Sequence, residues 1–290
     1  MDYTFHLLTL AALYGVLAIS LDLVVGHLGL VNLSQAAFYG LGAYTSALLT
    51  VQAGWPFLTG WVAGMGVAAG LSLLVSLPSF RLRDDYFVLS TFGFQMILWS
   101  LFNNWAELTR GPLGISGIPH PGLAGFKVET PLGFLLLAAG LLGIVKLALG
   151  RLTGSPFGRV LRALRESEPL VRSFGKDPRR FKVSAFAVSA AGAAAAGSLY
   201  AHYIRYVDPS SFTFLESVLV LSMVILGGAA SPWGPLLGAG VLVFLPEGLR
   251  FVGLSSAVAA PLRQILYGAA LVWMMRYQPR GWLGRWELGR

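Results

Sequence analysis

The sequence predicts an all-α polytopic integral membrane protein with eight to ten transmembrane helices. Only 12% of its 290 residues are charged, about half of the roughly 25% found in soluble domains, and its mean hydropathy is +0.69. A helix that crosses a bilayer needs about 20 apolar residues. Five long windows contain no Asp, Glu, Lys or Arg: 23–80, 86–106, 130–145, 183–204 and 217–246.

The apolar windows favour helices over a β-barrel. Barrel strands alternate apolar and polar residues in segments of about ten, whereas these windows are continuously apolar and rich in Leu, Ala and Gly. Backbone groups in lipid must pair internally, which leaves the α-helix. We expect nine spans, at 6–25, 34–52, 57–77, 86–104, 131–149, 180–204, 214–230, 233–252 and 258–276.

The first two spans require separate arguments. Residues 1–25 lack a basic region and a small-residue cleavage site, so we interpret them as a span and not as a removed signal peptide. Residues 22–45 are rich in glycine and polar groups and predict a broken or re-entrant helix, which changes the span count by one. Small residues predict close helix packing at Gly40, Gly42, Gly192 and Gly197.

Basic residues predict the orientation of the chain, because short basic loops face the cytoplasm. This rule places segment 151–182 inside, together with Arg81, Arg83, Arg276, Arg280, Arg285 and Arg290. Loops 105–130 and 205–213 are then outside, and nine spans leave the N-terminus outside as well. The net charge of +8 is therefore explained by orientation, and we expect no nucleic-acid partner.

Segment 151–182 is the most charged part of the chain, with nine of its 21 Lys and Arg residues and three acids. Ser155-Pro156, Glu168-Pro169 and Asp177-Pro178 resemble helix starts, and Gly175 suits a helix end, so we expect two short helices. Basic side chains there can bind anionic lipid headgroups. Alternatively, the segment docks on a cytoplasmic protein, with Leu and Phe side chains in a groove and a basic rim formed by Arg159, Arg162 and Arg165. We favour docking, and the two roles are compatible.

Several stretches, in this order, resemble the membrane permease subunits of bacterial ABC importers for branched-chain amino acids, in particular the M-type (LivM-like) subunits. The resemblance covers about residues 18–284. Each stretch alone is weak, and together they are specific to the permease family. They are Leu21–Thr45, Leu82–Phe94, Thr109–Pro119, Ser155–Glu166, Leu199–Tyr203, Pro209–Phe214, Met223–Gly238 and Leu245–Arg250.

The resemblance implies the fold of an ABC importer permease and a single transmembrane permease domain over residues 1–290, located in the bacterial cytoplasmic (inner) membrane. It implies a second, related permease subunit, two cytoplasmic ATPase subunits that bind ATP and Mg, and a periplasmic or lipoprotein substrate-binding protein. This chain itself would bind no cofactor. Membrane lipid surrounds it.

The family's ATPase-coupling segment matches the cytoplasmic loop at Gly158, Arg159, Arg162, Ala163, Arg165, Glu166 and Gly175. Residues 169–174 (PLVRSF) depart from the small and acidic residues that are common there. The family also often has glycine where this chain has Ala230.

Polar residues within the apolar windows are candidates for a translocation path, because polar groups at membrane depth face protein or water. They are Asn32, Ser34, Gln35, Thr45, Ser90, Thr91 and Gln95. Hydrogen bonding between helices is an equally good explanation for any one of them. The external loop is dominated by Gly and Pro, and its candidates for covering the pore or meeting the binding protein are Gly111, Pro112, Gly114 and Gly117.

The sequence contains no enzyme motif: G-x-x-x-x-G-K-[ST], H-E-x-x-H and G-x-S-x-G are all missing. The four histidines lack metal-ligand spacing, and no cysteine is present, so we expect neither catalysis nor a metal. We expect a non-catalytic importer subunit for branched-chain or other hydrophobic amino acids. Alternatives are an importer permease for urea, amides or other amino acids, a stand-alone secondary transporter or channel, and a membrane scaffold.

Overall fold

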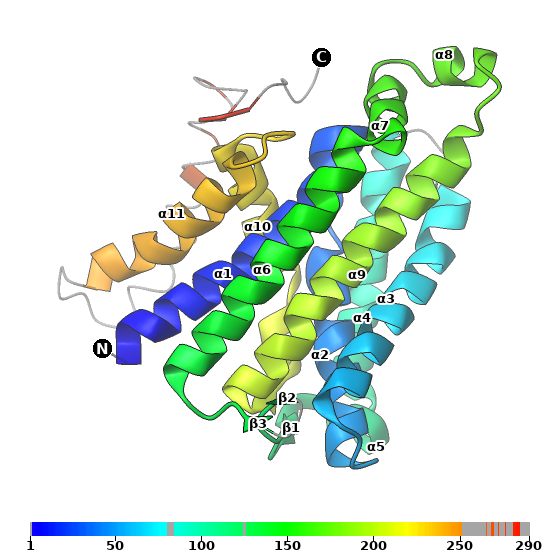
Figure 1. Ribbon diagram of the computed structural model, residues 1–290. Helices are drawn as coiled ribbons and strands as arrows, with labels where there is room; N and C mark the ends of the chain where they lie inside the picture. Colours follow the sequence, from blue (N-terminus) through cyan, green and yellow to red (C-terminus); the bar gives the residue numbers. More distant parts are fainter. Residues whose placement is uncertain are drawn as a thin grey trace.

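The computed structural model describes residues 2–79, 84–123 and 126–250, together with 265, 268, 269, 272, 276 and 281–284. Most of the expected span 258–276 lies outside the described residues, as do Arg81, Arg83, Arg280, Arg285 and Arg290. The rest of the chain forms an elongated helical bundle (Figure 1).

Eight described helices have 14 to 27 residues and match eight of the expected spans. They are α1 (Asp2–Asp22), α2 (Gln35–Val51), α3 (Phe57–Ser79), α4 (Asp84–Asn104), α6 (Pro131–Gly154), α9 (Pro178–Ile204), α10 (Phe214–Gly227) and α11 (Gly234–Arg250). Four segments are long and apolar enough on their own to cross a membrane: Tyr3–His27, Phe57–Leu77, Pro131–Gly154 and Pro178–Ile204. The all-α polytopic fold is confirmed.

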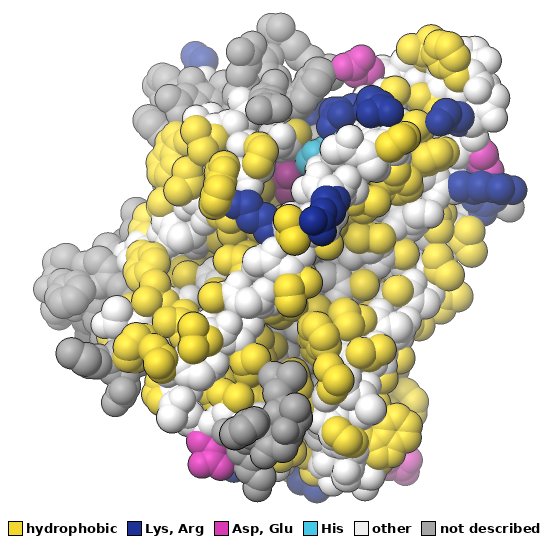
Figure 2. Space-filling model, in the orientation of Figure 1, with side chains coloured by type: hydrophobic (Ala, Val, Ile, Leu, Met, Phe, Trp, Pro, Cys, Tyr) yellow, Lys and Arg dark blue, Asp and Glu magenta, His cyan; other side chains and the backbone are white. Residues whose placement is uncertain are grey.

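The bundle has an inner and an outer set of helices. In their most apolar windows, 72% of α1 and 61% of α9 is buried, against 28% of α3 and 22% of α6. Helix α9 packs along α2 and α3, and α1 packs along α6 and α11. Figure 2 shows hydrophobic side chains over much of one face, with Lys and Arg gathered mainly towards the end that carries the cytoplasmic-loop helices. This distribution suits a protein surrounded by lipid.

Close helix packing at the predicted glycines is confirmed. A Cβ built on Gly197 would overlap the carbonyl oxygen of Tyr39, and one on Gly42 would overlap the backbone of Ala194. Both contacts lie between α2 and α9. Only glycine lets the two helices approach this closely.

The predicted broken helix is present between α1 and α2. Helix α1 continues as a single turn of π-helix, η1 (Leu23–His27). Residues 29–34 are then non-helical, Gly29 has a φ of +74°, and α2 begins at Gln35. Because π-helical turns are rare and concentrate at functional sites, this break marks a region of interest.

The loops predicted to lie outside meet at one end of the bundle. The segment between α4 and α6 contains α5 (Ala106–Thr109), a 3₁₀ turn η2 (Gly111–Leu113), and strands β1 (Ile115–Ser116), β2 (Gly122–Leu123) and β3 (Phe126–Lys127). Strand β1 pairs antiparallel with β4 (Tyr206–Val207), and β2 pairs with β3. A further 3₁₀ turn, η3 (Pro209–Phe212), precedes α10. Loops 105–130 and 205–213 therefore share one end, as the charge pattern predicts.

The loop predicted to be cytoplasmic, 151–182, folds at the opposite end and contains α7 (Pro156–Glu166) and α8 (Glu168–Ser173) (Figure 1). The Ser155 side chain accepts a hydrogen bond from Phe157 N, and Asp177 accepts one from Arg179 N. Gly175 has a φ of +70°, which suits the end of α8. The prediction of two short helices is confirmed, and the Ser167 side chain caps the second.

Candidate functional site

The start of α2 lies inside the bundle and is surrounded by buried polar side chains. Asn32 Oδ1 accepts hydrogen bonds from Ser34 N at 2.9 Å and Ser34 Oγ at 2.7 Å. Asn32 Nδ2 donates to Gln35 Oε1, and Gln35 Nε2 donates to Leu17 O on α1 at 3.2 Å. Asn32, Ser34 and Gln35 are fully buried.

Side chains from two other helices complete this network. Gln95 Oε1 on α4 accepts from Ala37 N at 2.8 Å, and Ser217 Oγ on α10 accepts from Ala36 N at 2.9 Å. Gln95 Nε2 donates to the carbonyl oxygen of Phe212 at 2.9 Å. Helix N-termini leave backbone N–H groups without intrahelical partners. Neutral amide and hydroxyl groups satisfy these donors of α2 in the apolar interior.

The structure thus brings together five of the seven residues proposed for the translocation path. Thr91 is the fifth, because its Oγ1 accepts from Leu33 N at 3.2 Å. The other two lie elsewhere: Thr45 is half-buried farther along α2, and Ser90 Oγ donates to Tyr86 O within α4. The network therefore holds the broken helix in place, and its role in a path stays a prediction.

A carboxylate also lies beside this network. Glu216, in the first turn of α10, accepts a hydrogen bond from Tyr14 Oη, in the middle of α1. It is adjacent in sequence to Ser217, which bonds to Gln95 Oε1 at 3.1 Å. An ionisable group within a bundle of spans is a functional candidate by default. The uncharged window 217–246 begins one residue after it.

On the loop, the three arginines of α7 have different environments. Arg159 is exposed, whereas Arg162 Nη1 donates to Thr153 O at 3.1 Å and Arg165 Nη1 donates to Gly26 O. The rim predicted from Arg159, Arg162 and Arg165 therefore has one arginine that faces outwards and two that bind this chain's own backbone.

A shallow apolar groove of about 230 Å³ lies between α7 and α8. Val160 and Val171 form its buried floor, Phe174 is 74% exposed beside it, and Arg159 and Lys176 stand at its edge. Among the other predicted coupling residues, Glu166 and Gly175 are exposed, Ala163 lines the groove, and Gly158 is buried against the Thr153 carbonyl, where a Cβ would overlap.

One ion pair joins α8 to the start of α9, and a second lies within α8. Glu168 accepts from Lys182 Nζ at 2.7 Å and from Arg172 Nη2 at 2.7 Å. Burial alone would raise the pKa of Glu168, but the hydrogen bonds and charges of Lys182 and Arg172 outweigh it and lower this pKa below its ordinary value. The position of α8 therefore depends on an ionised Glu168.

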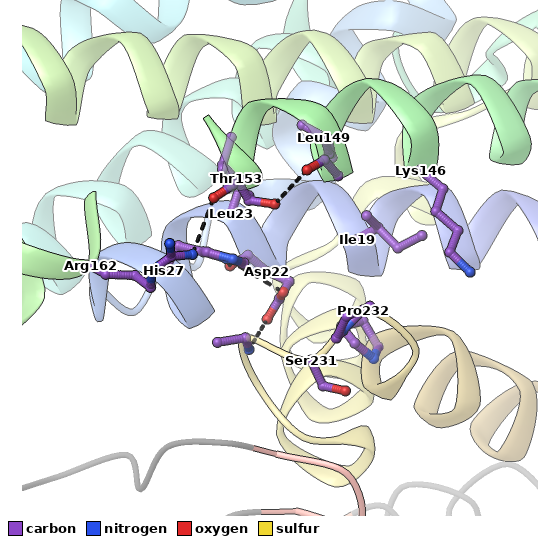
Figure 3. Close-up of a pocket in the computed structure, with 14 residues that line it drawn as sticks. Ile19, Asp22, Leu23, His27, Lys146, Leu149, Thr153, Arg162, Ser231 and Pro232 are labelled. Carbon is purple, nitrogen blue, oxygen red and sulfur yellow. Dashed lines mark hydrogen bonds and ion pairs between the residues drawn. The ribbon is translucent and has the colours of Figure 1, made fainter. Parts of the chain in front are cut away.

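A cavity of about 260 Å³, with both apolar and ionisable side chains in its lining, opens near the end that carries α7 and α8, between α1, α6 and the turn after α10 (Figure 3). Asp22, His27, Lys146 and Arg162 line it. Asp22 Oδ1 accepts from Ala230 N at 2.8 Å, and His27 Nδ1 lies 3.8 Å from Asp22 Oδ2. Within the described residues, no group of three His, Asp or Glu side chains is arranged to bind a metal.

The external loop is fastened to the end of α9. His202 Nδ1 lies 2.8 Å from Pro119 O, and Arg205 Nε donates to Ile118 O at 3.2 Å. The predicted Gly111, Gly114 and Gly117 have φ values of +55°, +66° and +77°, and Pro112 lies in η2. A Cβ on Gly114 would overlap Val207 O, so a side chain would block the backbone path there, and the positive φ of all three residues favours glycine.

Sequence reasoning did not assign roles to Ser217, Glu216 and His202. Their partners lie 181, 202 and 83 residues away in the chain, and such distances leave no periodic signal. Asp22 carried a weak signal, because a carboxylate at the end of an apolar span is costly to bury.

Comparisons with known proteins agree on one family. Residues 3–275 match the family model described as the permease component of the branched-chain amino acid transport system. The chain is 38% identical to the high-affinity branched-chain amino acid transport system permease protein LivM of Escherichia coli (strain K12), over 97% of this chain and 70% of that protein.

More distant relatives include both types of permease. The chain is 26% identical to the probable LivM permease of Methanocaldococcus jannaschii, over 93% of this chain and 90% of that protein. It is 23% identical to the permease protein LivH of Escherichia coli (strain K12), over 98% of this chain and 95% of LivH. No solved structure matches the chain significantly.

Proposed function

Because the chain belongs to the family of branched-chain amino acid transport system permease components, we propose that it is the permease subunit of an ATP-driven importer that moves branched-chain amino acids inward across the bacterial cytoplasmic membrane. The observation that carries this proposal is the ordered element α7–α8 at one end of an apolar bundle. It presents an apolar groove with basic edges to the aqueous side.

The shape of α7–α8 supports protein docking over lipid binding alone. Helix α7 buries Val160, Leu161 and Leu164 against the bundle, which fixes its orientation. Phe174 and Leu170 nevertheless remain 74% and 51% exposed. Lipid headgroups need basic side chains, but they do not need an apolar groove between two capped helices. A cytoplasmic ATPase subunit, which would bind the ATP and Mg, is the partner we assign to this surface.

The other partners follow from the two ends of the bundle and from the relatives. The chain resembles both LivM and LivH, which supports pairing with a second, related permease. The end with β1, β4 and the glycine-rich external loop lies opposite α7–α8. We assign this end to the substrate-binding protein that delivers the amino acid.

The substrate assignment rests on the names of the relatives and is compatible with the interior. The network of Asn32, Gln35 and Gln95 is neutral, so its chemistry equally suits urea, amides or other amino acids. Uptake by the complete complex, with leucine in competition with urea and a panel of amino acids, tests this assignment. Competition by leucine, isoleucine and valine alone is the expected result, and preference for urea or an amide would overturn it.

Glu216 supports a second candidate, a stand-alone secondary transporter. Such a protein needs an ionisable group within the bundle to couple transport to an ion gradient, and Glu216 is such a group. A proton ionophore distinguishes the two functions. ATP-driven import continues in its presence and survives Glu216→Gln, whereas gradient-driven transport is lost in both cases.

Docking is tested by co-purification of the ATPase with Phe174→Glu and Arg159→Glu variants. A charge in the groove should lower the retained ATPase by about tenfold or more, since losing a buried anchor costs roughly 2 kcal/mol. The matched control is Trp55→Glu, which changes a 51% exposed aromatic residue at the opposite end. Full retention of the ATPase by both groove variants would show that α7–α8 is not the docking surface.

A further inference from the structure

The cytoplasmic loop is attached to the break between α1 and α2 through the π-helical turn η1. Arg165 Nη1, on α7, donates to the carbonyl oxygen of Gly26 in the middle of η1. From the other side, Asp22 Oδ1 accepts from Ala230 N, in the turn between α10 and α11. The backbone of η1 is thus connected to α7, and the residue just before η1 is connected to the segment between α10 and α11.

Both connections leave little space between the parts. A Cβ on Gly26 would overlap Asp22 Oδ1 and lie 2.5 Å from Ala230 N, and a Cβ on Gly29 would lie 2.8 Å from Arg165 Cγ. Gly29 and Ala230 also have φ values of +74° and +57°. The left-handed conformation is costly for a residue with a Cβ, so the surrounding contacts must hold Ala230 in place.

Charged side chains lie close together around η1, and the acidic ones offset the cost of burying Arg165. Burial lowers the pKa of Arg165, while the carboxylates of Asp22 and Glu166 act in the opposite direction. His27 and Arg162 face the same space across the cavity shown in Figure 3. Arg165 therefore has both a backbone acceptor and a nearby opposite charge to hold it against η1.

The backbone beyond η1 leads directly to the polar network. Leu30 N donates to Val24 O at 3.2 Å, which closes the chain back onto η1. Leu33 N then donates to Thr91 Oγ1 on α4, and Gln35 Nε2 to Leu17 O on α1. Only the short segment 28–34, which these hydrogen bonds hold in place, separates η1 from the start of α2.

We propose that Arg165 and Asp22 are positioning residues that make η1 a rigid joint, through which a displacement of α7 reaches the N-terminus of α2 and the helices around it. This inference rests on the proposed function, because the ATPase supplies the displacement. Arg165 therefore acts in transmission and does not itself dock the ATPase, unlike Arg159.

The first test measures substrate molecules moved per ATP hydrolysed by the complete complex in proteoliposomes. For Arg165→Met we expect the ATPase to stay bound and to hydrolyse ATP, while the transport ratio falls by about tenfold, the scale of one lost charge-assisted hydrogen bond. Arg165→Lys should recover part of the ratio. The control is Arg180→Met, whose side chain is 86% exposed at the start of α9, and its ratio should equal that of the wild type.

The pair Asp22→Asn and Asp22→Leu tests the other side of the joint. An asparagine carbonyl can still accept from Ala230 N, so we expect only a small fall in the ratio, caused by the lost charge near Arg165, whereas leucine cannot accept and should lower the ratio as Arg165→Met does. A loss with asparagine equal to that with leucine would indicate a role for the charge or the proton, and would overturn the positioning role.

A cross-link tests rigidity even if single variants are unstable. The chain contains no cysteine, so His27→Cys on η1 with Arg162→Cys on α7, two residues that line the same cavity, introduces one thiol pair into it. If η1 and α7 move as one body, a bifunctional thiol cross-linker should leave the transport ratio at that of the uncross-linked double variant. A further fall on cross-linking would overturn the rigid joint, as would loss of the ATPase from Arg165→Met or an unchanged ratio in that variant. Failure of the proposed function would differ, because the wild-type complex itself would then not import these amino acids with ATP.

Discussion

Replacement of Gln95 with methionine is expected to destabilise the bundle at the start of α2. Methionine is similar in length but provides neither the carbonyl acceptor nor the amide donor. It would leave Ala37 N–H and the Phe212 carbonyl oxygen without the partners they have at 2.8 and 2.9 Å, and it would also remove the acceptor of the rotatable Ser217 hydroxyl. A buried polar group without a partner costs about 1–3 kcal/mol, so the free energy of unfolding should fall by roughly 2–6 kcal/mol for the two groups.

Thermal unfolding of the purified protein in detergent measures this effect. Gln52→Met is the matched control, because Gln52 lies exposed at the C-terminal cap of α2, the helix whose start Gln95 contacts, and its replacement should change stability by less than about 0.5 kcal/mol. Equal unfolding temperatures for the Gln95 and Gln52 variants would refute the reasoning, because the network would then contribute nothing to holding α2.

Three further outcomes are expected. Gly197→Ala should lower the unfolding temperature, at a cost of about 1–3 kcal/mol for forcing α2 and α9 apart. Gly66→Ala should not lower it, because a Cβ there meets nothing within 4 Å. Equal unfolding temperatures for the two variants would contradict the close-packing argument. The pKa of Glu168 is lowered from 4.5 on folding, so its stabilisation of α8 should be complete above pH 4.5 and lost as the pH falls through the folded pKa. Hydrogen exchange of the α8 amides measures this loss. Lys182→Met should weaken the pH dependence, and a pH profile identical to that of the wild type would refute the ion-pair assignment. Ala230→Gly should raise stability by about 1 kcal/mol by removing left-handed strain, measured by thermal unfolding, and a loss of stability would show that the methyl group has a packing role.

The sequence predicted the features that depend on local chemistry. Uncharged windows predicted the spans, because lipid excludes charge whatever the tertiary contacts. Ser155 and Asp177 predicted the helix starts at the cytoplasmic loop, because a cap acts on backbone groups two or three residues away. Glycine and polar residues between 22 and 45 predicted the break before α2.

Features that depend on distant contacts could not be predicted. The π-helical turn is stabilised by Ala230 and Arg165, which are more than 130 residues away from it in sequence. The helical spacing of Arg159, Arg162 and Arg165 predicted one face, but the two latter side chains turn back to this chain's own backbone. Replacing both with Glu would therefore break internal contacts as well as any docking contact, which makes Phe174 and Arg159 the better test of docking.

ATP-dependent uptake of radiolabelled leucine tests the central claim most directly. The proteoliposomes would contain this chain, its sister permease and the ATPase pair, with the binding protein added on the external side. We predict leucine accumulation that requires ATP and the binding protein, and that persists when a proton ionophore is present. Uptake that proceeds without ATP and stops with the ionophore would contradict the assignment of this chain as an ABC importer permease.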